Sequence, residues 1–148
     1  MSHERDHAGM KLLTTTLNVQ TEGLRLTDIT AELASWLKDE RAGEGQLTLF
    51  IRHTSASLVV QENADPDVLK DLEAFMSRLA PWSEKLYRHR TEGPDDMPAH
   101  IRSVVTNVSL TIPVMGGRLA LGPWQAVYLW EHRAEGQQRH VIAQLLSA

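Results

Sequence analysis

The first residues that could do chemistry lie around a predicted pair of strands and the start of the helix that follows. They are His53, Thr54, Ser55, Glu62, Asn63 and Asp65. An imidazole can exchange a proton near neutral pH, and a nearby carboxylate can orient it or bind a metal. Hydroxyls beside a helix N-terminus can hold a phosphate group. The alternative is structural: the hydroxyls satisfy turn backbone, and the histidine is a hydrogen-bonded core residue.

A second group of potential ligands lies in the polar segment after that helix. His89, Asp96 and His100 offer two imidazoles and a carboxylate, with Glu92 and Asp95 nearby. This combination suits a divalent ion such as Zn²⁺, Mg²⁺ or Mn²⁺. The spacing is not a zinc signature such as His-Glu-x-x-His. The alternative therefore stays open that an aspartate caps a helix here and that His89 is solvated.

Glu131 is the third candidate because of the strand in which it lies. Strand alternation places it on the same face as Val127 and Leu129, so its carboxylate is expected to point inward. Buried carboxylates are rare unless a base, a ligand or a metal pairs with them. Arg139, one hairpin later, is the expected partner, or a clamp for phosphate. The alternative is that the strand ends earlier and Glu131 is exposed.

Composition and charge narrow the classes of function. The chain has 148 residues, 19 acidic and 15 basic side chains, and a net charge of −4. This balance argues against nucleic acid as a partner and against a basic membrane-binding patch. The lack of cysteine excludes thiolate catalysis and cysteine-based zinc sites. No apolar stretch approaches the ~20 residues of a membrane-spanning helix, and the first residues lack a signal-peptide pattern, so we expect a cytoplasmic protein without membrane contact.

The apolar periodicity predicts one compact α+β domain over residues 10–148, with a mixed or antiparallel sheet and about three helices, after a flexible tail over residues 1–9. Strands are expected over Lys11–Gln20, Leu47–His53, Ala56–Gln61, Ser109–Val114, Arg118–Leu121, Gln125–His132 and Arg139–Leu146. The expected strand Gln125–His132 is apolar on both faces, as a central strand should be. Helices are expected from Asp28 to Glu40, from an Asp65 cap to Leu79, and over a short segment near Pro98. The third helix is expected to bury Ile101, Val104, Val105 and Val108.

Several strings give the chain a resemblance to a known family. They are His53-Thr54-Ser55-Ala56-Ser57, Glu62-Asn63-Ala64-Asp65-Pro66, the run from Glu92 to His100, and Gly122-Pro123-Trp124-Gln125 with Glu131. In their order and spacing these strings resemble the YjbQ family, from about Lys11 to the C-terminus. The chain departs from the family pattern at Pro123, where Thr is frequent, and at Met97, where Asn is frequent. Neither change removes a histidine or an acid.

The resemblance implies an α+β fold that assembles as a homotrimer with polar sites near the subunit boundaries. It also implies a weak thiamine-phosphate synthase activity, which joins hydroxymethylpyrimidine diphosphate to thiazole phosphate and releases pyrophosphate. A metal at the histidine-rich site is likewise implied, and Gln125 joins the expected substrate ligands.

The residues and the resemblance together predict a metal-dependent enzyme acting on a phosphorylated small molecule. The predicted catalytic residues are His53, Glu62, Asn63 and Glu131. The predicted substrate or phosphate ligands are Thr54, Ser55, Asp65, Gln125 and Arg139. The predicted metal ligands are His89, Asp96 and His100. Two alternatives stay open: another metal-dependent hydrolase or transferase, and a non-catalytic metal-binding assembly protein.

Overall fold

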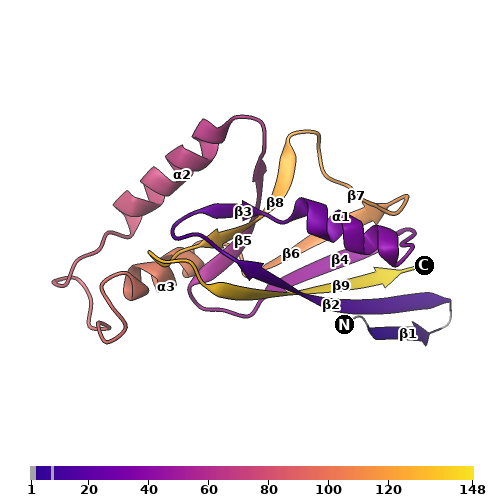
Figure 1. Ribbon diagram of the computed structural model, residues 1–148, viewed down its shortest axis with the longest axis horizontal. Helices are drawn as coiled ribbons and strands as arrows, with labels where there is room; N and C mark the ends of the chain where they lie inside the picture. Colours follow the sequence, from indigo (N-terminus) through magenta and orange to yellow (C-terminus); the bar gives the residue numbers. More distant parts are fainter. Residues whose placement is uncertain (1–2, 8) are drawn as a thin grey trace.

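The computed structural model describes residues 3–7 and 9–148, and this part of the chain is an α+β domain of antiparallel sheets and three helices (Figure 1). The strands are β1 (His3–His7), β2 (Met10–Gln20), β3 (Leu26–Asp28), β4 (Gly45–Ile51), β5 (Ala56–Glu62), β6 (Ser109–Met115), β7 (Arg118–Leu119), β8 (Gln125–Glu131) and β9 (Gln138–Ser147). The helices are α1 (Thr30–Asp39), α2 (Pro66–Leu79) and α3 (Asp96–Val104). The predicted fold class is confirmed.

The larger sheet has six strands in the order β1-β2-β9-β4-β6-β7, and every neighbouring pair is antiparallel. In β4 the side chains of Leu47, Leu49 and Ile51 are buried while the alternate residues are exposed. This period of two places one face of the sheet in the core, where Leu33 and Leu37 of α1 pack against it.

The smaller sheet has three strands in the order β3-β8-β5. β8 lies in the centre and is buried from Ala126 to Glu131, which confirms the expectation of a central strand. Its pairing with β5 matches Ala56 to Glu131 at one end and Glu62 to Gln125 at the other. This register fixes which candidate residues share an end of the sheet.

The helix starts follow the sequence signals closely. Asp65 caps α2: its side chain accepts a hydrogen bond from the Asp67 N–H at 2.9 Å, and Pro66 is the first helical residue. In α1 the Asp28 carboxylate accepts from the Thr30 N–H at 2.9 Å, although the cap position itself is Ile29. The apolar stripe of α2 is less buried than expected, because Met76 is its one buried residue, and the helix projects from the body of the molecule (Figure 1).

The predicted inward face of α3 is wrong. Val104 and Val105 are 83% and 54% exposed, and Val108, beyond the helix, is also exposed. The buried residues of α3 are Asp96, Pro98, Ala99, Arg102 and Ser103, and Ile101 is partly buried. Arg102 pairs with Glu73 of α2 at 2.8 Å. Apolar periodicity cannot predict this orientation, since the partner that allows Arg102 to be buried comes from another helix.

Two further boundaries differ from the expectation. Strand β4 ends at Ile51, so His53 lies in the connection to β5 rather than on a strand. Within the expected tail, His3–His7 form β1, which pairs antiparallel with the start of β2. Residues 1, 2 and 8 of the expected tail lie outside the described residues.

Candidate metal centre and the buried pair beside it

Three of the predicted site residues meet at one point. The Nε2 atoms of His89 and His100 lie 2.7 Å and 3.0 Å from the same oxygen, Oδ2 of Asp96. One ligand atom from each of the three residues lies within 4.8 Å of the others. We call these residues the histidine–aspartate cluster. Its aspartate is 2% exposed and its histidines are 36% and 30% exposed, so the cluster opens to solvent on the imidazole side.

The local structure explains how the cluster forms. Asp96 and His100 are four residues apart on α3, a spacing that places side chains one above the other on one face of a helix. His89 comes from the long connection between α2 and α3. A helix and a loop therefore bring two histidines to one carboxylate.

The tautomer of His100 leaves the cluster in need of a cation. Its Nδ1 lies 2.9 Å from the backbone carbonyl oxygen of Thr54. A carbonyl only accepts hydrogen bonds, so Nδ1 carries the proton, and in a neutral ring the Nε2 lone pair then points at Asp96. Two acceptors at 3.0 Å repel unless a proton or a metal ion lies between them. A backbone carbonyl that orients a histidine in this way is typical of metal ligands.

The second oxygen of Asp96 is held by Arg133, which follows β8. The Nη1 of Arg133 lies 3.0 Å from Asp96 Oδ1, and its Nε donates to Oδ2 of Asp95 at 2.9 Å. Burial raises the pKa of Asp96, but the hydrogen bond to His89 and the charges of His100 and Arg133 outweigh this effect, so the pKa lies below its usual value. The carboxylate is therefore ionised at neutral pH.

A second group of charged residues is closed to solvent. Glu131 is fully buried and accepts four hydrogen bonds: from Thr21 Oγ1 at 2.5 Å, from the Arg133 N–H at 3.1 Å, from Arg139 Nε at 2.8 Å and from Arg139 Nη2. Arg139 is also buried, and its Nη2 donates to Ser55 Oγ at 2.9 Å. We call Glu131 and Arg139 the buried ion pair.

This pairing changes the interpretation of several predicted site residues. Glu131 does point inward, as expected, but its oxygens are all bonded within the chain, so it offers nothing to a substrate. Arg139 is held by Glu131 and Ser55 and is not a free phosphate clamp. Ser55 is likewise buried by this contact. We therefore assign these residues a positioning role in place of the predicted catalytic and phosphate-binding ones.

His53 is half-buried beside the same pair. Its Nε2 accepts a hydrogen bond from the His140 N–H at 2.8 Å, and its Nδ1 lies 3.4 Å from Arg139 Nη1. Burial, then the charges of Arg139 and His140, lower the pKa of His53. The Nε2 lone pair is taken by the His140 N–H, so in a neutral ring Nδ1 carries the proton and no lone pair is free for general base catalysis in this arrangement.

Four predicted site residues lie at the other end of the small sheet. Glu62 and Gln125 are paired at the far end of β5 from Ala56, a separation of about 20 Å along a seven-residue strand. Asn63 and Asp65 follow Glu62, and Asp65 caps α2. The Gln125 side chain accepts from the Gly122 N–H at 2.8 Å. Within one chain, the structure does not bring these four residues to the histidine–aspartate cluster.

Sequence reasoning missed two polar residues that directly follow β8. Arg133 is separated from Asp95 by 38 positions, and no local pattern marks it. His132 is buried, with Nε2 2.8 Å from Ser57 Oγ, and its Nδ1 has no hydrogen-bond partner among the described residues. Burial, then the charges of Arg102 and Arg139, lowers the pKa of His132 to about 3. The available signal for His132 was its position as a polar residue at the end of a strand predicted to be buried.

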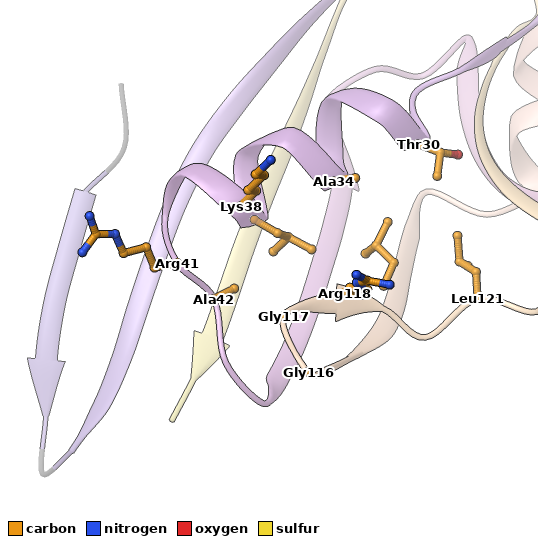
Figure 2. A pocket seen from close by; sticks show the side chains of 11 residues that line it. Thr30, Ala34, Lys38, Arg41, Ala42, Gly116, Gly117, Arg118 and Leu121 are labelled. Carbon is orange, nitrogen blue, oxygen red and sulfur yellow. The ribbon is translucent and has the colours of Figure 1, made fainter.

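One cavity of the molecule lies away from this chemistry. It has a volume of about 640 Å³ and lies between α1 and the turn that joins β6 to β7 (Figure 2). Its basic residues are Lys38, Arg41 and Arg118, and Figure 2 shows Arg41 pointing away from the cavity. It is lined by none of the predicted site residues, so we do not take its size as a sign of the active site. Across the described residues, no helix is long and apolar enough to span a membrane.

The fold and the cluster together define an antiparallel α+β protein with a two-histidine, one-carboxylate centre. The family described as UPF0047 protein YjbQ-like matches residues 15–148, and the chain belongs to this family.

Relatives and solved structures agree with this assignment. The chain is 51% identical over 126 residues to UPF0047 protein sll1880 of Synechocystis sp., covering 85% of this chain and 86% of the relative. It is 44% identical over 133 residues to UPF0047 protein YjbQ of Escherichia coli O157:H7, covering 89% and 94%. The crystal structure of the conserved hypothetical protein TT1486 from Thermus thermophilus matches with a TM-score of 0.80 and 36% identity, over 88% of this chain and 98% of that one. These names state no activity, so the function of this chain rests on its site.

Proposed function

We propose that the protein is a divalent-metal-dependent enzyme that acts on a phosphorylated small molecule, with weak thiamine-phosphate synthesis as its reaction. The observation that supports a bound metal ion is the geometry of His100. Its Nδ1 is fixed by the Thr54 carbonyl, and its Nε2 shares Asp96 Oδ2 with His89. The reaction itself rests on the family resemblance.

The donor set favours Zn²⁺ or Mn²⁺ over Mg²⁺. Two imidazole nitrogens and one carboxylate oxygen suit a transition ion, whereas Mg²⁺ prefers oxygen ligands and bound water. Catalytic zinc sites use three protein ligands and leave a position open for water or substrate. The partly exposed histidines leave that side of the cluster accessible from solvent.

The chemistry of the ion supports an anionic substrate. Glu92, Asp95 and Asp96 place three carboxylates around Arg133, so the charges of the chain do not by themselves attract a phosphate group. An open coordination position on a divalent ion would bind a phosphate oxygen directly.

In the proposed reaction, the thiazole nitrogen forms a bond to the pyrimidine methylene carbon while the bond from that carbon to the diphosphate oxygen breaks. Pyrophosphate leaves with the electron pair, so negative charge grows on the leaving group. A bound divalent ion would supply stabilisation of that charge. The residues of the chain would hold the ion and the substrate in place. His89, Asp96 and His100 would bind the ion. The exposed Thr54 hydroxyl, which forms no hydrogen bond within the described residues, would donate to a phosphate oxygen.

The test is product formation from the two named substrates with and without metal. Purified protein is stripped with a chelator, reloaded with Zn²⁺ or Mn²⁺, and thiamine phosphate is quantified after oxidation to its fluorescent thiochrome. We expect activity to disappear on stripping and to return with metal, and to be absent in the double variant His89→Ala with His100→Ala. Equal product before and after stripping would contradict the metal-dependent mechanism. Faster turnover of an unrelated phosphate ester would favour another metal-dependent hydrolase or transferase.

We further propose that the chain assembles as a homotrimer in the cytoplasm. The cytoplasmic location is supported by the lack of cysteine. Assembly is supported by large apolar side chains left exposed on and near α2 and α3: Phe75, Leu79, Trp82, Leu86, Val104 and Val105.

Light scattering should give three times the mass of one chain at micromolar concentration. The double variant Phe75→Ser with Leu79→Ser should lower that mass, and Met115→Ser, an exposed apolar residue on the β6–β7 side, serves as the control. A monomeric wild-type protein would refute the trimer.

A further inference from the structure

We propose that Arg133 selects the metal of the histidine–aspartate cluster by keeping carboxylate oxygens out of its coordination sphere. The inference rests on the proposed function only in that the cluster must bind a divalent ion. It concerns which ion is preferred, and it makes Arg133 a positioning residue rather than a ligand.

The guanidinium of Arg133 holds both neighbouring aspartates at once. Its Nη1 pairs with Asp96 Oδ1 at 3.0 Å, so only Oδ2 of that carboxylate faces the two histidines. Its Nε donates to Asp95 Oδ2 at 2.9 Å, and the Ala134 N–H donates to the same oxygen at 2.9 Å. Asp95 lies directly beside a ligand in sequence, yet it is not one of the residues whose ligand atoms converge.

Arg133 is itself fixed from two sides. Its Nη2 donates to the Glu92 carbonyl at 2.9 Å, and its backbone N–H donates to Glu131 Oε2 at 3.1 Å. The buried ion pair therefore anchors the backbone of the residue whose side chain organises the cluster. An arginine suits this position because its planar fork can hold two carboxylates, whereas a lysine offers a single point charge.

The consequence is a centre with two nitrogen ligands and one oxygen ligand. Without Arg133, Asp96 could bind an ion through both oxygens, and Asp95 would lose its strongest partner. Added oxygen ligands favour Mn²⁺ and Mg²⁺ relative to Zn²⁺. Loss of the positive charge would also raise the affinity for every divalent ion, so the affinity for a single ion does not test the role of Arg133 in selecting the metal. The ratio of the affinities for Mn²⁺ and Zn²⁺ tests it.

The experiment measures dissociation constants for Zn²⁺ and Mn²⁺ in the wild type and in Arg133→Gln, by competition with a chromophoric chelator. We expect the affinity for Mn²⁺ relative to Zn²⁺ to rise at least about tenfold, the low end of effects from residues that orient ligands. The visible spectrum of the Co²⁺-loaded variant should weaken, as expected when the coordination number increases. Arg90→Gln, an exposed arginine next to His89, removes the same charge and should leave both the ratio and the spectrum unchanged.

Arg133→Lys restores the charge without the fork and should give a smaller rise in the ratio, with the same sign. If Arg133→Gln does not fold, as judged by circular dichroism, the lysine variant carries the test. Affinities for Zn²⁺ and Mn²⁺ that fall together, or a ratio that matches the wild type, would overturn the inference. A wild-type protein that binds neither ion would refute the proposed function instead, so the two failures are distinguishable.

Discussion

The histidine–aspartate cluster and the buried ion pair are both built from charged side chains that the sequence marks as chemically capable, and they lie on either side of Arg133. In the buried ion pair, each oxygen of Glu131 is bonded to a donor of the same chain. In the cluster, two imidazoles share one carboxylate oxygen, and one of them is oriented with a lone pair toward it. A closed set of partners indicates a structural role, whereas lone pairs that converge on one point and remain partly exposed indicate a binding site for a cation.

The largest expected effect comes from breaking the buried ion pair. Arg139→Met leaves the Glu131 carboxylate buried without its main partner, which should lower the free energy of unfolding by about 3–5 kcal/mol. Urea denaturation measures the loss, and Arg118→Met, at an exposed position, should change stability by no more than about 0.5 kcal/mol. A loss below about 1 kcal/mol would mean that the pair is not structural, and a direct role of Arg139 toward substrate would need to be considered again.

A pH titration tests in a second way whether the buried residues next to Glu131 are closed to solvent. The folded chain holds the pKa of His132 near 3, against 6.5 when unfolded. The unfolded state therefore binds the proton first, and stability is lost as the pH falls below 6.5, by about 1.4 kcal/mol per pH unit. In the presence of a chelator, the wild type should lose about 1.6 kcal/mol more than His132→Gln between about pH 6.5 and about pH 5. Equal slopes would show that His132 is accessible to protons in the folded state.

The smallest expected effect concerns Asp65, which the sequence also marked as a substrate ligand. Asp65→Ala removes the cap of α2 and should cost about 1 kcal/mol in stability without changing metal affinity. Asp71→Ala, on the exposed side of the same helix, makes the same charge change without removing a cap. A drop in metal affinity in Asp65→Ala would show that the far end of the small sheet communicates with the cluster.

Local sequence signals predicted the fold well. The period-two pattern of β4 and the two-sided apolar run of β8 are properties of consecutive residues, and both were confirmed. The Asp65-Pro66 helix start was confirmed for the same reason. The orientation of α3 could not be predicted, because the partner that allows Arg102 to be buried, Glu73, lies on another helix.

The candidate site was predicted only in part. Asp96 and His100 share a helix face by their spacing alone, so their meeting could be expected once the helix was placed. The distance between His53 and Glu62 was also predictable, since the intervening β5 is an extended strand that holds its two ends apart. Arg133 could not be found, because its contacts with Asp95 and Asp96 depend on how β8 and α3 pack.

Metal stoichiometry shows whether His89, Asp96 and His100 bind an ion. After loading with Zn²⁺ and gel filtration, elemental analysis should find one ion per wild-type chain and none in the double variant His89→Ala with His100→Ala. The matched control is His53→Ala with His140→Ala, which removes a second close histidine pair, whose ring centroids lie 5.6 Å apart, and should keep the ion. If the His89 and His100 variant retains one ion per chain while folded, the site lies elsewhere and the proposed function is wrong.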